Sequence, residues 1–252
     1  YFDTISLKLY SSILLIFFLQ QWMLAAEPIA LISKLRGTVK HKMASDIKYR
    51  SKTELNTSIL SDSQIQTKNK AFSKVVYLDD GTSISMYPDT EIIIKGTIEN
   101  RMIYKQVDLF QGIIRMNVTN QMSKEFKLTT PYSELTCREC SFWIISHESN
   151  GDQFIKESGD ALVLNSSIKR TRKLVSDSTL VSQKEVEFDQ FETPIADIKF
   201  IESLMLDADE KFLQYKKETP EEKKSETITN IVVIKLKNAA NIEREIVVTY
   251  TQ

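Results

Sequence analysis

The pattern of apolar and polar positions divides the chain into a short leader, a long region of strands and a C-terminal part. From Ile29 to Phe188, apolar and polar residues alternate with a period of two in short runs, as in strands that bury one face. The predicted strands are 30–40, 71–78, 83–87, 91–95, 105–110, 113–118, 126–129, 135–145, 153–157, 161–165 and 184–188. Strands this close together, with no helical pattern between them, predict a mainly β fold, an antiparallel β-sandwich or roll.

Glycines mark where several of these strands break or turn. Asp80-Gly81 stands between two alternating runs and predicts a hairpin, because glycine supplies the positive φ that the turn requires. Gly37 and Gly112 indicate breaks within 30–40 and between 105–110 and 113–118. The adjacent Asp79 and Asp80 resemble a pair of catalytic carboxylates, but beside Gly81 they are better interpreted as turn residues.

The period changes after Thr193-Pro194. Apolar residues then recur every three or four positions up to Tyr215, which predicts an amphipathic helix within residues 191–217. Pro194 would occupy the first helical position, with Thr193 as the cap. The mixed charges of 218–228 indicate a solvated linker. Residues 229–252 predict a terminal β-hairpin, with strands at Ile231–Lys237 and Glu245–Tyr250.

The first 26 residues have the layout of an export signal. Lys8 precedes an apolar stretch centred on Ile13–Leu19, and small residues follow at Ala25 and Ala26. Gln20-Gln21 interrupt the run before the roughly 20 apolar residues that a spanning helix needs. We therefore expect a signal helix cleaved near Ala26, so that the mature protein is periplasmic or extracellular.

An uncleaved signal anchor is the competing interpretation of residues 1–26. The chain begins with Tyr1 and not with Met, so an upstream cytoplasmic segment is an open alternative. In that case the apolar run would hold the protein in the inner membrane. The membrane would then be contacted only through this N-terminal segment.

Composition narrows the classes of partner. The 252 residues are 42% hydrophobic, enough for a core, and the net charge of −1 gives no overall attraction to nucleic acid. The dense basic cluster Lys169–Lys173 is interpreted as a solvated hairpin tip, with contact to an acidic polymer or a lipid headgroup as the alternative. We expect an envelope or outer-membrane protein, or a polysaccharide, as partner, and no nucleic acid.

Cys137 and Cys140 are the two cysteines, in the spacing C-x-x-C. Their flanks read as strand, whereas a redox-active pair usually opens a helix. A disulfide, structural or labile, inert thiols, and metal or thiol chemistry all remain open. On a flat strand, residues three apart face opposite sides, so a bridge requires a turn or bulge at Arg138-Glu139.

The sequence offers few candidates for a catalytic site. With only His41 and His147 in the chain, the arrangements of histidine with serine or cysteine have few candidates, and His147 reads as a loop residue. The sequence contains neither a Gly-rich phosphate loop nor the pattern H-E-x-x-H. We predict no enzyme activity, no cofactor and no metal.

Taken in order, segments between Ile29 and Phe188 resemble the motifs of FecR-type exported domains. Gly37-Thr38-Val39 resembles the family's opening G-x-V, and residues 66–90 resemble its strand, acidic-Gly turn, strand and P-x-[ST]. Residues 109–115 are similar to its strand-G-strand element. Its F-x-[LV]-x-T-P, V-R-G-T-x-F and E-G elements are similar to 126–131, 137–142 and 157–163 respectively.

The chain departs from the family pattern at two places. Glu139-Cys140 stands where the family has Gly-Thr, and the late A-G-Q is absent after Lys173. A bridge from Cys137 to Cys140 that fixes the local bend is a hypothesis suggested by the first departure.

The resemblance implies a non-enzymatic, β-rich domain, residues 27–190, outside the cytoplasm. In the best-known members this domain senses an outer-membrane receptor and relays the signal across the inner membrane to a sigma factor. We expect an exported FecR-like binding or interaction module. The alternative is the periplasmic sensor part of such a sigma-factor regulator. The sequence does not identify the ligand or the oligomeric state.

Overall fold

The structure is a computed structural model that describes residues 26–49, 53–122, 124–218, 229–237 and 243–251. Residues 1–25 of the predicted signal helix and residues 219–228 of the linker predicted at 218–228 lie outside the described residues. The chain divides into two units, one up to Ala208 and one from Asp209 onward.

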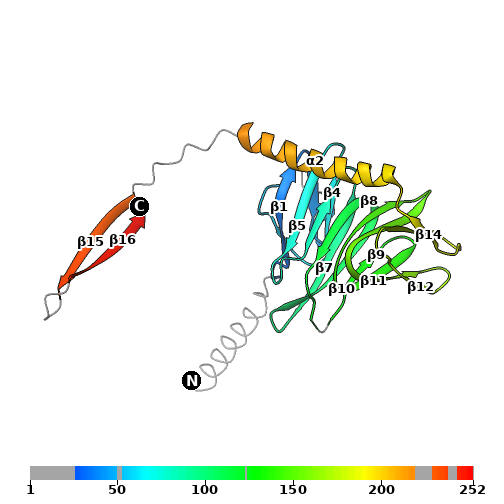
Figure 1. Cartoon of the computed structure of the whole chain (residues 1–252), viewed down its shortest axis with the longest axis horizontal. Helices are drawn as coiled ribbons and strands as arrows, with labels where there is room; N and C mark the ends of the chain where they lie inside the picture. The colour runs from blue at the N-terminus through cyan, green and yellow to red at the C-terminus, as the bar shows by residue number, and fades with distance from the viewer. Residues whose placement is uncertain (1–25, 50–52, 123, 219–228, 238–242, 252) are drawn as a thin grey trace, which may run out of the picture. The chain divides into compact units, whose positions relative to one another are not determined.

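Within the described part of the first unit, fourteen strands form one continuous sheet (Figure 1). They are β1 (Ala30–Arg36), β2 (Val39–Lys42), β3 (Ser58–Ile59), β4 (Ser63–Thr67), β5 (Phe72–Tyr77), β6 (Ser83–Met86), β7 (Glu91–Glu99), β8 (Met102–Val118), β9 (Phe126–Thr129), β10 (Ser133–His147), β11 (Gly151–Asn165), β12 (Arg170–Lys173), β13 (Ser178–Ser182) and β14 (Asp189–Glu192). The strand pairs are antiparallel apart from β8 and β9, which run parallel.

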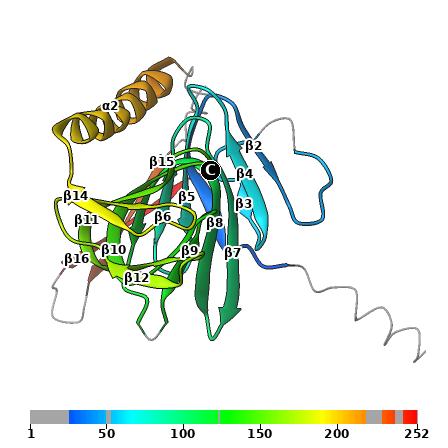
Figure 2. The same ribbon diagram turned by 90° about the vertical axis from the view of Figure 1, so that its right-hand side faces the viewer.

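The sheet curls into two layers because β8, β10 and β11 run through both of them (Figure 2). The first layer contains β2, β4, β7, the start of β8, β9, the start of β10, the end of β11 and β12. The second contains β3, β1, β5, β6, the other parts of the long strands, β13 and β14. Strands that pass from one sheet to the other at bends are a known way of forming corners in β-sandwiches.

Each of the long strands bends at an irregular position. β8 pairs with β7 up to Gln111 and with β10 from Gly112 onward, where φ is 109°. β10 changes partner from β9 to β8 across Arg138 and Glu139, which bulge out of the ladder. β11 bends opposite that bulge, at Gly159, with φ of 75°. The predicted glycine break at Gly112 is therefore a bend in one strand.

The alternation of the strands buries one face of each layer in a single core. In β4 and β7, for example, Ile65, Ile92 and Ile94 are fully buried, while their neighbours are partly exposed. Ile84 and Ile114 from the second layer belong to the same cluster. Burying each side chain of this size contributes roughly 1.5–3 kcal/mol, so the core stabilises the curled sheet.

The helix α2 (Ile195–Glu218) begins directly after Pro194, whose carbonyl accepts the N–H of Asp197 at 2.9 Å. Its part in the first unit packs on the outer face of the second layer, where Ile201 and Ala208 bury against Phe72 and Trp143. Arg36 also ties the helix to the sheet by donating from Nη2 to Asp207 Oδ2 at 2.9 Å.

The mainly β fold with a C-terminal helix is confirmed. The predicted strand at 184–188 is wrong, because Lys184 and Glu185 form a turn between β13 and β14, with φ of 59° at Glu185. The second unit contains β15 (Thr229–Lys237) and β16 (Glu243–Thr251), which pair as an antiparallel hairpin where one was predicted.

Candidate functional site

The turn between β5 and β6 places two carboxylates beside β8. Gly81, with φ of 78°, closes the turn, and the N–H of Tyr77 donates to Thr82 O at 2.9 Å. Asp80 Oδ1 accepts the N–H of Thr82 at 2.8 Å, a local bond typical of Asp in turns. Asp79 instead accepts the N–H of Ile103 at 2.9 Å, from the start of β8.

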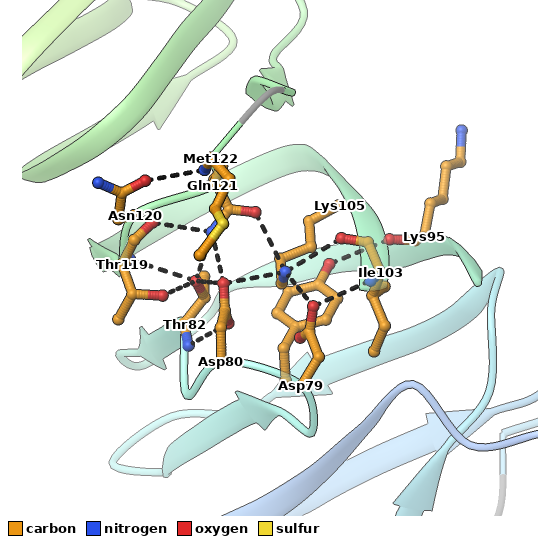
Figure 3. Close-up of polar contacts among 11 residues, drawn as sticks. Asp79, Asp80, Thr82, Lys95, Ile103, Lys105, Thr119, Asn120, Gln121 and Met122 are labelled. Carbon is orange, nitrogen blue, oxygen red and sulfur yellow. Dashed lines mark hydrogen bonds and ion pairs between the residues drawn. The ribbon is translucent and has the colours of Figure 1, made fainter. Parts of the chain in front are cut away.

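Lys105 on β8 reaches this turn and forms the centre of a buried polar cluster (Figure 3). Its side chain is 2% exposed. The ammonium group contacts four oxygen atoms: Asp79 Oδ2 at 2.7 Å, Asp80 Oδ2 at 3.0 Å, Ile103 O at 3.0 Å and Gln121 Oε1 at 3.1 Å. Burying an unpaired ammonium is costly, so a lysine is tolerated at this inward position because two carboxylates pair with it.

Gln121 completes the cluster from the loop after β8. Its Nε2 contacts Asp80 Oδ2 at 2.5 Å, Thr82 Oγ1 at 3.1 Å and Thr119 O at 2.8 Å (Figure 3). We call Asp79, Asp80, Thr82, Lys105 and Gln121 the Lys105 cluster. It fastens the β5–β6 turn and the loop after β8 to the edge of the core.

The surroundings fix the charge of Asp80 and of the neighbouring Tyr77 hydroxyl. Burial raises the pKa of Asp80, but hydrogen bonds from Thr82, Lys105, Thr119 and Gln121 outweigh burial and hold the pKa below its usual value. Burial, and then the nearby carboxylates, raise the pKa of the Tyr77 hydroxyl. Asp80 is thus an anion at neutral pH, and the phenol beside it is neutral.

The interpretation of Asp79 and Asp80 as turn residues describes only part of their role. Their partners, Lys105 and Gln121, are not predicted by the sequence pattern around the turn. A signal for Lys105 was present, since it shares the inward face of its strand with Ile103, Val107 and Leu109. A lysine in the middle of an inward run needs a carboxylate partner. No such pattern marks Gln121, which lies in a loop.

The second candidate site is the bulge in β10. The structure joins Cys137 and Cys140, both buried, by a disulfide. The bridge spans Arg138 and Glu139, the irregularity that the spacing required. A cavity of about 640 Å³ adjoins the bulge. Its charged lining residues are Glu125, Arg138, Glu139, Asp160 and Lys173.

A third feature lies under α2. The rings of Tyr87 and Trp143 stack with centroids 5.0 Å apart, and Phe72 meets Tyr87 edge to face at 5.5 Å. Trp143 Nε1 and Arg115 Nε donate to the Glu157 carboxylate at 2.8–3.1 Å. Burial raises the pKa of Glu157, but these bonds and one from Ser141 outweigh it, so the pKa is lowered.

The other sequence candidates are dispersed. His41 is buried on β2 and contacts Thr53 at 3.0 Å, whereas His147 is exposed at the end of β10. The basic cluster 169–173 forms the turn after β11 and strand β12, where all four strand residues are exposed. Arg170 and Lys173 pair with Glu187 at 2.8 Å and Asp160 at 2.9 Å.

Neither metal ligands nor a membrane helix is found in the described ranges. Over those residues, no three His, Cys, Asp or Glu side chains gather as ligands for a metal ion. Likewise, none of the helices described has the length and apolar character needed to cross a bilayer.

The central part of the chain is similar to a known protein family. Residues 63–158 match the model of the family FecR protein. The resemblance to FecR-type domains is thereby confirmed over residues 63–158. This segment runs from β4 into β11 and contains the Lys105 cluster and both cysteines.

Solved structures offer a partial likeness. Two crystal structures of a candidate anti-sigma factor from Parabacteroides distasonis ATCC 8503 have a TM-score of 0.46, with 16% and 15% sequence identity. Each match covers 54% of this chain and 62% of that protein, which is less than two thirds of its length. A search of curated proteins finds no match.

Proposed function

We propose that this protein is an exported, non-enzymatic binding module of the bacterial envelope. The FecR match over residues 63–158 is the observation that carries the proposal. The apolar run before Glu27 supports export, because it has the three-part layout of a signal. The partner is an envelope or outer-membrane protein, or a polysaccharide.

The bulge in β10 is the surface that we assign to the partner. It combines an open cavity of about 640 Å³ with side chains of both charges. The disulfide crosses the bulge, and Cys140 pairs with Gly159 on the facing strand, so the backbone is constrained on both sides. A rigid, mixed-charge surface suits recognition of a polar partner, because little ordering is needed on binding.

Capture of envelope components by the tagged, exported protein tests this assignment. We expect wild type to retain a specific component, and Arg138→Glu to lose it at least tenfold, because the charge at the centre of the bulge is reversed. Lys184→Glu is the matched control, since Lys184 is a strongly exposed cation on a turn outside the cavity lining. Equal capture by wild type and Arg138→Glu would assign the partner to another surface.

The second candidate function is the sensor part of a sigma-factor regulator, and the FecR match favours it as well. In that case residues 1–26 would be a membrane anchor that follows a cytoplasmic segment. The upstream coding sequence and the N-terminal mass of the exported protein separate the two functions. A mature N-terminus near Glu27 supports the free module, whereas an intact 1–26 segment preceded by a cytoplasmic domain supports the sensor.

A further inference from the structure

We propose that Lys105 and Asp79 form an intramolecular isopeptide crosslink, made by the protein itself within the Lys105 cluster. Lys105 Nζ lies 2.7 Å from Asp79 Oδ2, so the amine and the carboxyl group are in contact before any reaction. The two side chains are 2% and 11% exposed, which excludes most competing water. This inference is independent of the proposed binding function.

Each group that amide formation requires is present around this contact. Lys105 Nζ is the nucleophile and the Asp79 carboxyl carbon is the electrophile. The N–H of Ile103 donates to Asp79 Oδ2 at 2.9 Å and can stabilise negative charge on this oxygen in the tetrahedral intermediate. Asp80 Oδ2, 3.0 Å from Nζ, is placed to accept a proton from the ammonium. Gln121 positions Asp80 and Lys105 together.

The reaction is a condensation that balances without another reactant. Asp80 relays one proton from the Lys105 ammonium to Asp79, and the neutral amine attacks the carbon of the resulting neutral carboxyl group. A C–N bond forms, one Asp79 oxygen leaves as water with two of the nitrogen's protons, and Asp80 returns to its carboxylate. The products are one amide and one water molecule, with no change of oxidation state.

The fold favours this condensation over the reverse hydrolysis. Holding amine and carboxyl in contact replaces an encounter in solution, and such preorganisation produces very high effective concentrations. Linkage also converts a buried ammonium and carboxylate into a neutral amide, whose burial is less costly than that of two ions. The product would tie the β5–β6 turn covalently to β8, across the 25 residues between Asp79 and Lys105.

Peptide mapping of the full, folded wild-type protein tests the proposal. After reduction, alkylation and trypsin digestion, an unlinked chain yields peptides 75–95, 102–105 and 106–115. The crosslink protects Lys105 from cleavage and yields one branched peptide, 75–95 joined to 102–115, lighter by one water than its two parts. We expect the branched peptide from most chains. Recovery of the unlinked peptides alone would overturn the proposal and leave an ordinary buried salt bridge.

Variants separate the proposed chemistry from other crosslinks. Lys105→Arg keeps the cation but has no reactive amine, so we expect it to lose the branched peptide. Lys95→Arg is the control, because Lys95 also pairs with an aspartate, Asp108, but is 33% exposed on the sheet surface. It should keep the branched peptide. Asp80→Asn should slow or abolish linkage, and linkage at the wild-type level would refute the role given to Asp80.

Discussion

Two carboxylates on β11 illustrate how the surroundings of one residue decide its charge. Glu157 is held by Arg115 and by the indole N–H of Trp143, which favour the anion. Asp152 is fully buried and contacts two hydroxyl groups, Ser146 Oγ at 2.7 Å and Thr130 Oγ1 at 2.5 Å. Burial outweighs these hydrogen bonds and raises the pKa of Asp152.

The hydrogen atoms around Asp152 also suit the neutral acid. Thr130 Oγ1 contacts both Ser133 O, at 3.0 Å, and Asp152 Oδ2. A hydroxyl has one hydrogen and a carbonyl only accepts. If Thr130 donates to Ser133 O, a protonated Asp152 must supply the hydrogen of the second contact.

Asp152→Asn is therefore expected to stabilise the protein at neutral pH, by on the order of 1 kcal/mol. Asparagine can donate to Thr130 and accept from Ser146 without a buried charge. The raised pKa means that Asp152 favours folding while protonated and loses that contribution as pH rises through the folded pKa. The advantage of the variant should thus shrink as pH falls toward about 4. Urea unfolding at several pH values measures it, and equal stability at pH 7 contradicts it.

Glu157→Gln should have the opposite sign. The pKa of Glu157 is lowered, so the anion contributes stability above the ordinary pKa of about 4.3, and this is lost as pH falls through the folded pKa. We expect the variant to be less stable by about 1 kcal/mol at pH 7, a modest figure because the site is half-buried. The same urea series checks this, and a difference that persists unchanged in acid would show a cause other than charge.

At the scale of the element, the corners of the long strands depend on single glycines. Gly159 has φ of 75°, and a Cβ built there would lie 2.1 Å from Glu139 O in the facing bulge. Gly81 has a similar φ of 78°, but apart from its own chain neighbours no atom lies within 4 Å of such a Cβ. The two glycines share a conformation and differ in the space around them.

Gly159→Ala is expected to lower the free energy of unfolding by about 3 kcal/mol, because strain and a backbone clash combine. Gly81→Ala carries the strain alone and should cost about 1–2 kcal/mol. Denaturant unfolding of both variants gives the comparison. Similar losses would mean that the bulge in β10 moves freely to admit a side chain.

Strand alternation and turn residues made much of the fold predictable. Residues 71–78 and 83–87 were expected as a hairpin around Asp80-Gly81, and the structure has β5 and β6 there with φ of 78° at Gly81. Alternation fails where a bulge or an exposed turn interrupts it. Val186 is 49% exposed, whereas Phe188 packs partly buried against the core, so only one of the two apolar residues of 184–188 faces it.

The candidate sites were less predictable, because they depend on contacts between distant segments. For Cys137 and Cys140, the sequence offers a disulfide as one of several alternatives, together with the bulge that a bridge would require, since both features are local. The contact of Asp79 with Lys105 joins residues 26 positions apart and depends on how two strands pair. Sequence alone offers the inward position of Lys105, but not the identity of its partners.

At the scale of the whole molecule, the disulfide makes the redox state of the two cysteines depend on the cell compartment in which the protein folds. Such bonds persist outside the reducing cytoplasm. We expect the protein, exported as proposed and denatured without reductant, to show no reactive thiol, and residues 27–252 made in the cytoplasm to show two. Because the bridge closes a very short loop, its loss should cost only about 2 kcal/mol. Two free thiols in the exported protein would contradict the bond.

The three strands that run through both layers have a further consequence for how the domain comes apart. Each layer needs β8, β10 and β11 to complete its set of strands. A break in any of these strands therefore leaves no layer that can fold independently. The domain should therefore unfold in a single two-state transition, without a populated half-folded intermediate. Proteolytic cleavage within β8, β10 or β11 should therefore unfold the whole β domain. Cleavage in the turn at 184–186 leaves these three strands intact.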